Sequence, residues 1–184
     1  MKEKPMLKFL ICAATVSACL LAQESPFSAN IKVEYGLAKG VITRAADKMP
    51  EANYSFKPTD DVRSFGQLVG HVADAQYTFC SAASGEKSPA TGSVEQTKTT
   101  KADLVAALKE AFAYCDKVYD GMTDATASQT VKFFGRDITK LGVLAFSNMH
   151  DYEHYGNMVT YMRLKGIVPP SSEQQQRPAA PAKK

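Results

Sequence analysis

Residues 139–166 read TKLGVLAFSNMHDYEHYGNMVTYMRLKG, a long stretch in which side chains of similar character recur at helical intervals. The positions that keep steps of three and four residues are Leu141, Leu144, Ala145, Asn148, Tyr152, Tyr155, Val159 and Met162. Gly166 suits the residue just past a helix, and Pro169-Pro170 cannot continue one. We therefore expect one helix from about residue 139 to residue 165.

Three earlier segments show the same periodicity, at about residues 26–48, 64–84 and 100–121. The middle one begins with the clearest start signal, because Ser64 and Gln67 have the spacing of a capping box. The connecting residues 50–62 and 85–99 are polar, whereas Val131–Phe134 and the following Gly135-Arg136-Asp137 predict a short extended piece and a turn. Four helices of roughly 20 residues with no confident strand predict an all-α fold, a four-helix bundle.

Length and composition agree with one globular domain. The chain has 184 residues, of which 45% are hydrophobic, and that content is too high for a wholly disordered chain. Its formal net charge of +3 is too weak to indicate nucleic-acid binding, so we expect no such partner. No apolar run reaches the 18 or more residues of a spanning helix, which argues against an integral membrane protein.

The N-terminal residues have the pattern of an export signal. Three lysines within residues 2–8 precede the uncharged run FLICAATVSACLLA at residues 9–22, so we predict a secretory signal peptide over residues 1–22. We therefore favour a secreted or periplasmic location. Residues 16–19 also resemble a lipoprotein box, which leaves a lipid anchor at Cys19 as the alternative. The helical domain then covers residues 23–168, and residues 169–184 are expected to be a disordered tail.

Two cysteines remain after removal of the leader, Cys80 and Cys115. In an oxidising compartment such a pair can form one disulfide, but each can equally be a small buried side chain on its own helix. The sequence leaves both possibilities open, since it does not show whether the two Cα atoms come close enough.

The chain contains three histidines, and their placement points to a metal. His150 and His154 are four residues apart in the last predicted helix, so both imidazoles project from one face, about 40° apart. His71 lies midway along the second predicted helix and can supply a third nitrogen if these two helices are neighbours. Three protein ligands leave positions open for water or substrate. The competing interpretation is that the histidines are ordinary core or surface residues.

Two segments resemble the DinB-like proteins. They are SFGQLVGHVADA at residues 64–75 and HDYEHYGN at residues 150–157, the latter continuing through YMRLKGIVPP at residues 161–170. The resemblance implies a four-helix bundle that holds a divalent metal, zinc or nickel, through three histidines. Carried over by position, these ligands are His71, His150 and His154. Tyr155 stands where the family pattern has arginine and Asn157 where it has glutamine; we expect neither to touch the histidines.

Other polar residues can be placed near the histidines by helix angle: Gln67, Asp74, Thr78, Ser147, Asn157 and Tyr161. Asp74 is the weak candidate for a catalytic group, as a base or as a carboxylate that orients an imidazole, although a solvated side chain explains it equally well. Asp151 and Glu153 flank the ligands but point away from His150. We assign Gly156 to close helix packing.

These features favour an exported metal-binding protein that acts as a metal-dependent hydrolase or transferase on an unidentified small molecule. Some DinB-like relatives use low-molecular-weight thiols, but an exported protein would not meet those cytosolic cofactors. The alternative is a non-catalytic module that binds a metal or a small ligand. An open metal position that faces a pocket would favour the enzyme. An apolar edge of the bundle is compatible with a homodimer.

Overall fold

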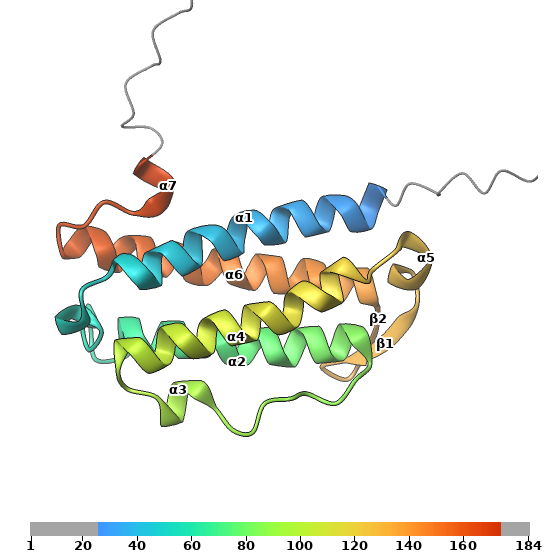
Figure 1. Cartoon of the computed structure of the whole chain (residues 1–184), viewed down its shortest axis with the longest axis horizontal. Helices are drawn as coiled ribbons and strands as arrows, with labels where there is room; N and C mark the ends of the chain where they lie inside the picture. Colours follow the sequence, from blue (N-terminus) through green and yellow to red (C-terminus); the bar gives the residue numbers. More distant parts are fainter. Residues whose placement is uncertain (1–25, 174–184) are drawn as a thin grey trace, which may run out of the picture.

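The computed structural model describes residues 26–173 and shows four long helices packed side by side (Figure 1). They are α1 (Pro26–Lys48), α2 (Phe65–Ser84), α4 (Lys101–Asp120) and α6 (Lys140–Leu164). Helix α2 packs against both α4 and α6, and α1 closes the other side of the bundle against the same two helices. The predicted all-α four-helix bundle is thus confirmed. The predicted leader at residues 1–22 and the tail residues 174–184 lie outside the described part of the chain.

The helix ends are fixed by the residues expected from the sequence. The side chain of Ser64 accepts a hydrogen bond from the backbone N–H of Gln67, and the Gln67 side chain accepts one from the backbone N–H of Ser64. Thr139 caps α6 in the same manner by accepting from the N–H of Gly142. Gly166 follows α6 with a φ of 69°, a left-handed conformation that glycine adopts without strain.

Short elements occupy the connections. They are the 3-10 turn η1 (Glu51–Asn53), the helical turns α3 (Val94–Thr97), α5 (Asp124–Ala127) and α7 (Pro170–Glu173), and the strands β1 (Thr130–Phe133) and β2 (Arg136–Thr139). The strands pair as an antiparallel hairpin, which confirms the expected extended piece; the turn lies at Phe134 and Gly135, whereas Arg136 and Asp137, expected in the turn, belong to β2. Helix α3 falls within the segment that was expected to be a polar loop. Helix α7 lies within the expected disordered tail, and an ion pair from Glu173 to Lys48 ties it to α1.

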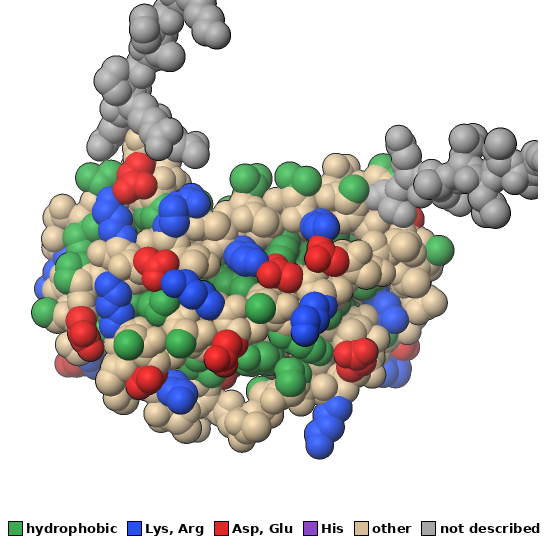
Figure 2. All heavy atoms as spheres, in the orientation of Figure 1, with side chains coloured by type: hydrophobic (Ala, Val, Ile, Leu, Met, Phe, Trp, Pro, Cys, Tyr) green, Lys and Arg blue, Asp and Glu red, His purple; other side chains and the backbone are tan. Residues whose placement is uncertain are grey.

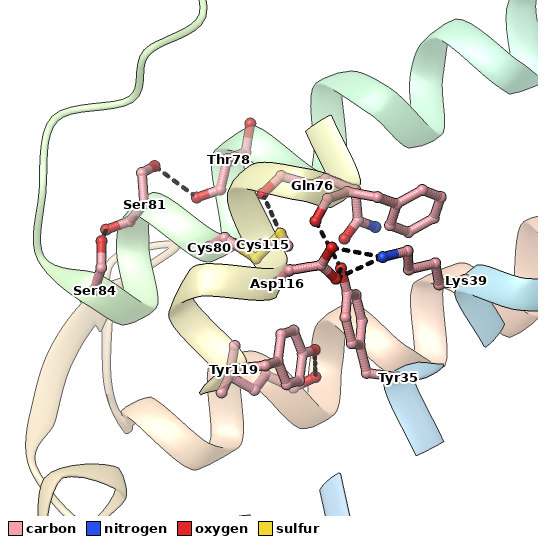
Figure 3. Close-up of a disulfide and its surroundings, with 12 residues drawn as sticks. Tyr35, Lys39, Gln76, Thr78, Cys80, Ser81, Ser84, Cys115, Asp116 and Tyr119 are labelled. Carbon is pink, nitrogen blue, oxygen red and sulfur yellow. Dashed lines mark hydrogen bonds and ion pairs between the residues drawn. A yellow bond between two sulfur atoms is a disulfide. The ribbon is translucent and has the colours of Figure 1, made fainter. Parts of the chain in front are cut away.

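The core lies between the four long helices, and a disulfide crosses it. Cys80 of α2 and Cys115 of α4 are both fully buried and bonded, with Cα atoms 5.5 Å apart. Figure 3 shows this bond beside the side chains that link α1 to α4, where Lys39 and the hydroxyl of Tyr35 both bind the Asp116 carboxylate. The structure therefore contains the disulfide, one of the two possibilities left open by the sequence.

The surface agrees with the weak net charge. On the face drawn in Figure 2, basic and acidic side chains are interspersed over the helices. Within residues 26–173, none of the helices is both long enough and apolar enough to cross a membrane.

Candidate metal centre

The three histidines converge on one point between α2 and α6. The Nε2 atom of His150 lies 3.2 Å from Nε2 of His71 and 3.0 Å from Nε2 of His154. The rings of His71 and His154 meet edge to face, with centroids 4.7 Å apart. This cluster is the group of potential metal ligands found among the described residues. His71 was expected to supply the third nitrogen only if α2 and α6 are neighbours, and the structure meets this condition.

The distances from Nε2 of His150 to the other two Nε2 atoms fit a shared metal ion, and the three ligand atoms all lie within 4.8 Å of one another. Nitrogen ligands about 2.0–2.1 Å from a metal lie roughly 2.8–3.4 Å from one another when neighbouring ligands form right or tetrahedral angles. Both Nε2 separations, 3.2 Å and 3.0 Å, fall in this range.

The proton positions also favour a cation at this point. Nδ1 of His71 lies 3.2 Å from Oε2 of Glu95, and a carboxylate only accepts hydrogen bonds, so Nδ1 of His71 is the donor in this contact. The Nε2 lone pair of His71 then faces the Nε2 atom of His150. A cation between these atoms would accept their lone pairs.

The surroundings keep two of the rings neutral. Burial, together with the neighbouring histidines, lowers the pKa of His150 from 6.5 to about 3. Burial, together with the neighbouring His71, lowers the pKa of His154 from 6.5 to about 4. Both rings are therefore unprotonated near neutral pH, which is the state that binds metals.

Glu95 contacts Nδ1 of His71, and its part in the site was not predicted from the sequence. The carboxylate bridges two groups, since Oε2 contacts His71 and Oε1 accepts from Nε of Arg63 at 2.9 Å. Glu95 reaches this position because α3 lies directly against α2 at Gly70. A Cβ on Gly70 would stand 2.6 Å from the Cα of Glu95, so this contact requires glycine.

Asp74 has a different environment from the one expected for a catalytic group. Its carboxylate accepts hydrogen bonds from the Ser93 hydroxyl and from the backbone N–H groups of Val94 and Glu95, at 2.6–3.1 Å. It thus caps α3 and contacts none of the three imidazoles. The carboxylate that orients an imidazole is Glu95, and Asp74 acts on it through the helical turn.

The residues beside the ligands differ in part from expectation. Asn157 touches the triad after all, with Nδ2 3.5 Å from Nδ1 of His154. Tyr155 turns away from it and binds Ser171, which anchors α7.

Gly156 has open space around it, so the expected role in close packing is wrong. Asp151 does point away from the ligands, but into the core, where Gln76 donates to it and burial raises the pKa of its carboxyl well above the usual range.

A pocket of about 580 Å³ adjoins the triad. His154 and Asn157 form part of its wall, together with Gln67, Arg63 and Glu95. Tyr161 also lines the pocket, and its hydroxyl donates a hydrogen bond to the carbonyl of Arg63 at 2.8 Å. The site therefore combines three convergent imidazoles with a polar pocket. Fold and site together define a helical bundle with a candidate metal centre.

Comparison with known proteins places this bundle in a family. The sequence profile of the DinB superfamily matches residues 37–158, and the chain belongs to that superfamily. The uncharacterized protein YjoA of Bacillus subtilis is 27% identical over 132 residues, which cover 70% of this chain and 84% of YjoA.

Solved structures show the same fold. A DinB-like protein from Bacillus cereus superposes with a TM-score of 0.68 at 17% identity, covering 77% of this chain and 95% of that protein. A mycothiol-dependent maleylpyruvate isomerase superposes with a TM-score of 0.58 at 14% identity, covering 73% of this chain and 65% of the isomerase.

Proposed function

We propose that this protein is an exported, metal-dependent enzyme, a hydrolase or transferase that acts on a small molecule through a divalent ion, zinc or nickel. The observation that carries the proposal is the convergence of three Nε2 atoms, with separations of 3.0 and 3.2 Å, beside a pocket of about 580 Å³. An ion that is exposed to such a pocket can meet a substrate, whereas a sealed ion would serve structure or storage.

Each residue of the site has a part in this proposal. His71, His150 and His154 would hold the ion, which supplies Lewis acidity toward a substrate oxygen or water. Glu95 orients the ring of His71 by accepting a hydrogen bond from its Nδ1–H. Arg63 keeps Glu95 in place through Nε, and its position in the pocket wall suits a polar group of the substrate.

The alternative is a module that binds a metal or ligand without turnover. The hydrogen bonds that Asp74 accepts from Ser93 and Val94 favour this alternative, because they occupy the carboxylate that was the candidate catalytic base. The structural similarity to the isomerase supports an enzymatic function, since that protein is a catalyst with the same fold. A panel of ester, amide and thiol-transfer substrates, assayed with metal-loaded protein and with a His150→Ala variant, separates these two functions.

Metal content is the first test. Protein purified without a histidine tag should contain about one equivalent of a divalent ion by elemental analysis, and His150→Ala should contain none. Asn148→Ala is the matched control, because Asn148 is also a buried polar residue of α6 but binds Tyr119 and the carbonyl of Ile31. It should retain the ion despite lower stability. Absence of metal in wild type after incubation with divalent ions would refute the proposal. The molar mass of the same sample tests the predicted homodimer.

Export has its own support and its own test. The sequence of residues 9–22 suits a signal peptide, and the Cys80–Cys115 disulfide is of the kind that forms in oxidising compartments. Cell fractionation and the intact mass of the processed protein should show a periplasmic form cut after Ala22. A lipid-modified form that is lost in Cys19→Ala would instead establish the membrane anchor. A full-length cytosolic form would refute export.

A further inference from the structure

The tip of the β1–β2 hairpin carries a phenylalanine in a conformation that disfavours it. Phe134 has a φ of +46°, and Gly135 beside it has a φ of +76°. Glycine and asparagine adopt this left-handed region easily, but a bulky side chain there is an outlier. The ring gains little burial in exchange, since 71% of Phe134 is exposed. Unfavourable backbone of this kind is concentrated at functional sites.

The hairpin itself is firmly placed. Its strands pair from Thr130–Thr139 to Phe133–Arg136. Phe133 is only 8% exposed, and its ring packs on Phe79 of α2 and Phe146 of α6. The backbone N–H of Lys140 closes the base by donating to the carbonyl of Gln129. Phe134 is therefore held at a defined point.

An aromatic wall connects this point to the candidate metal centre. The Phe134 ring centroid lies 4.2 Å from that of Phe133 and 6.0 Å from that of Phe146. Phe79 meets Phe146 edge to face at 5.3 Å. Phe79 also meets the ring of His150 edge to face at 5.1 Å. The wall thus ends on one of the three imidazoles.

The wall and the polar pocket lie on opposite sides of the histidines along α6. Phe146, His150 and His154 follow one another at intervals of four residues, so they share one helix face. Asn157 and Tyr161 continue beyond His154 and line the pocket. A molecule that meets an ion at the histidines would have polar groups toward the pocket and aromatic rings toward the hairpin.

We propose that the exposed ring of Phe134 and the half-buried ring of Phe146, with the buried Phe79 behind them, form an apolar subsite for the substrate of the metal centre, which takes an aromatic or branched aliphatic group attached to the metal-binding end. This inference rests on the proposed function. Rings that are edge to face or offset attract another ring, so an aromatic substituent suits the wall well. The exposed ring of Phe134 would cover that substituent and remove it from water.

Two hydroxamates serve as probes, because both bind metal ions through the same two oxygens but only one carries a ring. Isothermal titration of metal-loaded protein should show benzohydroxamate binding about 2- to 10-fold more tightly than acetohydroxamate. Phe134→Asn removes the ring and provides a residue that tolerates the left-handed region. It should abolish this preference, leave acetohydroxamate affinity unchanged, and raise the melting temperature by about 2–4 °C.

Phe27→Asn is the matched control, since Phe27 is 67% exposed at the start of α1 and is not part of the wall. It should keep the preference for benzohydroxamate. Phe134→Gly provides a second variant that also suits the turn and should behave as Phe134→Asn does. Equal affinity of wild type for both probes, or a preference that survives in both Phe134 variants, would overturn the subsite. Absence of binding by either probe to metal-loaded protein would overturn the open metal centre and the subsite with it.

Discussion

The replacement Gly70→Ala should weaken metal binding although Gly70 is not a ligand. In the structure, a Cβ at this position would stand 2.6 Å from the Cα and 2.9 Å from the backbone N of Glu95. Ordinary contacts of a Cβ are 3.4–4 Å, so α3 would have to move away from α2 by about 1 Å. Such a shift lengthens the 3.2 Å contact between Glu95 and Nδ1 of His71 beyond hydrogen-bonding distance.

The magnitude follows from the partner that is lost. Removal of the group that orients a metal-binding histidine typically lowers metal affinity 10- to 100-fold, and we expect Gly70→Ala to fall in that range. Stability should change less. Overpacking costs about 1–3 kcal/mol, while alanine favours a helix interior over glycine by about 1 kcal/mol, so the net loss is about 0–2 kcal/mol.

Competition with a chromogenic chelator measures the affinity, and urea unfolding of the metal-free protein measures the stability. Gly156→Ala is the control, because Gly156 is also inside a long helix but has open space where its Cβ would be. It should gain up to about 1 kcal/mol of stability and keep wild-type metal affinity. If Gly70→Ala also keeps wild-type affinity, Glu95 does not position His71 and the reasoning fails.

Three further predictions concern the core and the pH response. Replacing Cys80 and Cys115 by alanine opens a link across a sequence separation of 35 residues and should cost roughly 3–4 kcal/mol in urea unfolding; a loss below 1 kcal/mol would contradict this. The pKa of His154 falls from 6.5 to about 4 on burial, so metal-free wild type should lose stability relative to His154→Asn as the pH decreases below about 6.5. Burial raises the pKa of the Asp151 carboxyl well above 3.8, so its contribution to stability decreases as the pH rises above that value. Asp151→Asn should therefore gain stability relative to wild type with rising pH, and a constant difference would refute this.

The parts of the fold that were predictable are those controlled by local rules. The helical period and the Ser64–Gln67 pair located α2, and both features act within a few residues of one another. The same holds for His150 and His154, whose common face follows from the four-residue interval alone. His71 was assignable on the condition that α2 and α6 are neighbours, a condition that the fold meets. The histidines' occupation by a metal stays a prediction.

Glu95 was not predictable, because its position depends on contacts between distant segments. The polar segment that contains it has no hydrophobic period, and α3 is only four residues long. Its placement requires Asp74 to bind its N-terminal N–H groups and Gly70 to leave room for its backbone. Neither requirement is visible in the segment itself. A glycine inside a predicted helix is the signal for such a close approach, but the glycine expected to have this role was Gly156, whereas the structure gives it to Gly70.

The candidate centre therefore combines two parts of unequal rigidity. His150 and His154 stand on one continuous helix, so their separation is set by the helix itself. His71 depends on Glu95, and Glu95 depends on a four-residue turn whose N-terminal N–H groups are bound by the Asp74 carboxylate. Few backbone hydrogen bonds hold such a turn, so it opens at a lower free-energy cost than the long helices do. Among substitutions that touch no ligand, those in the short segment behind His71 should therefore lower the affinity for metal the most.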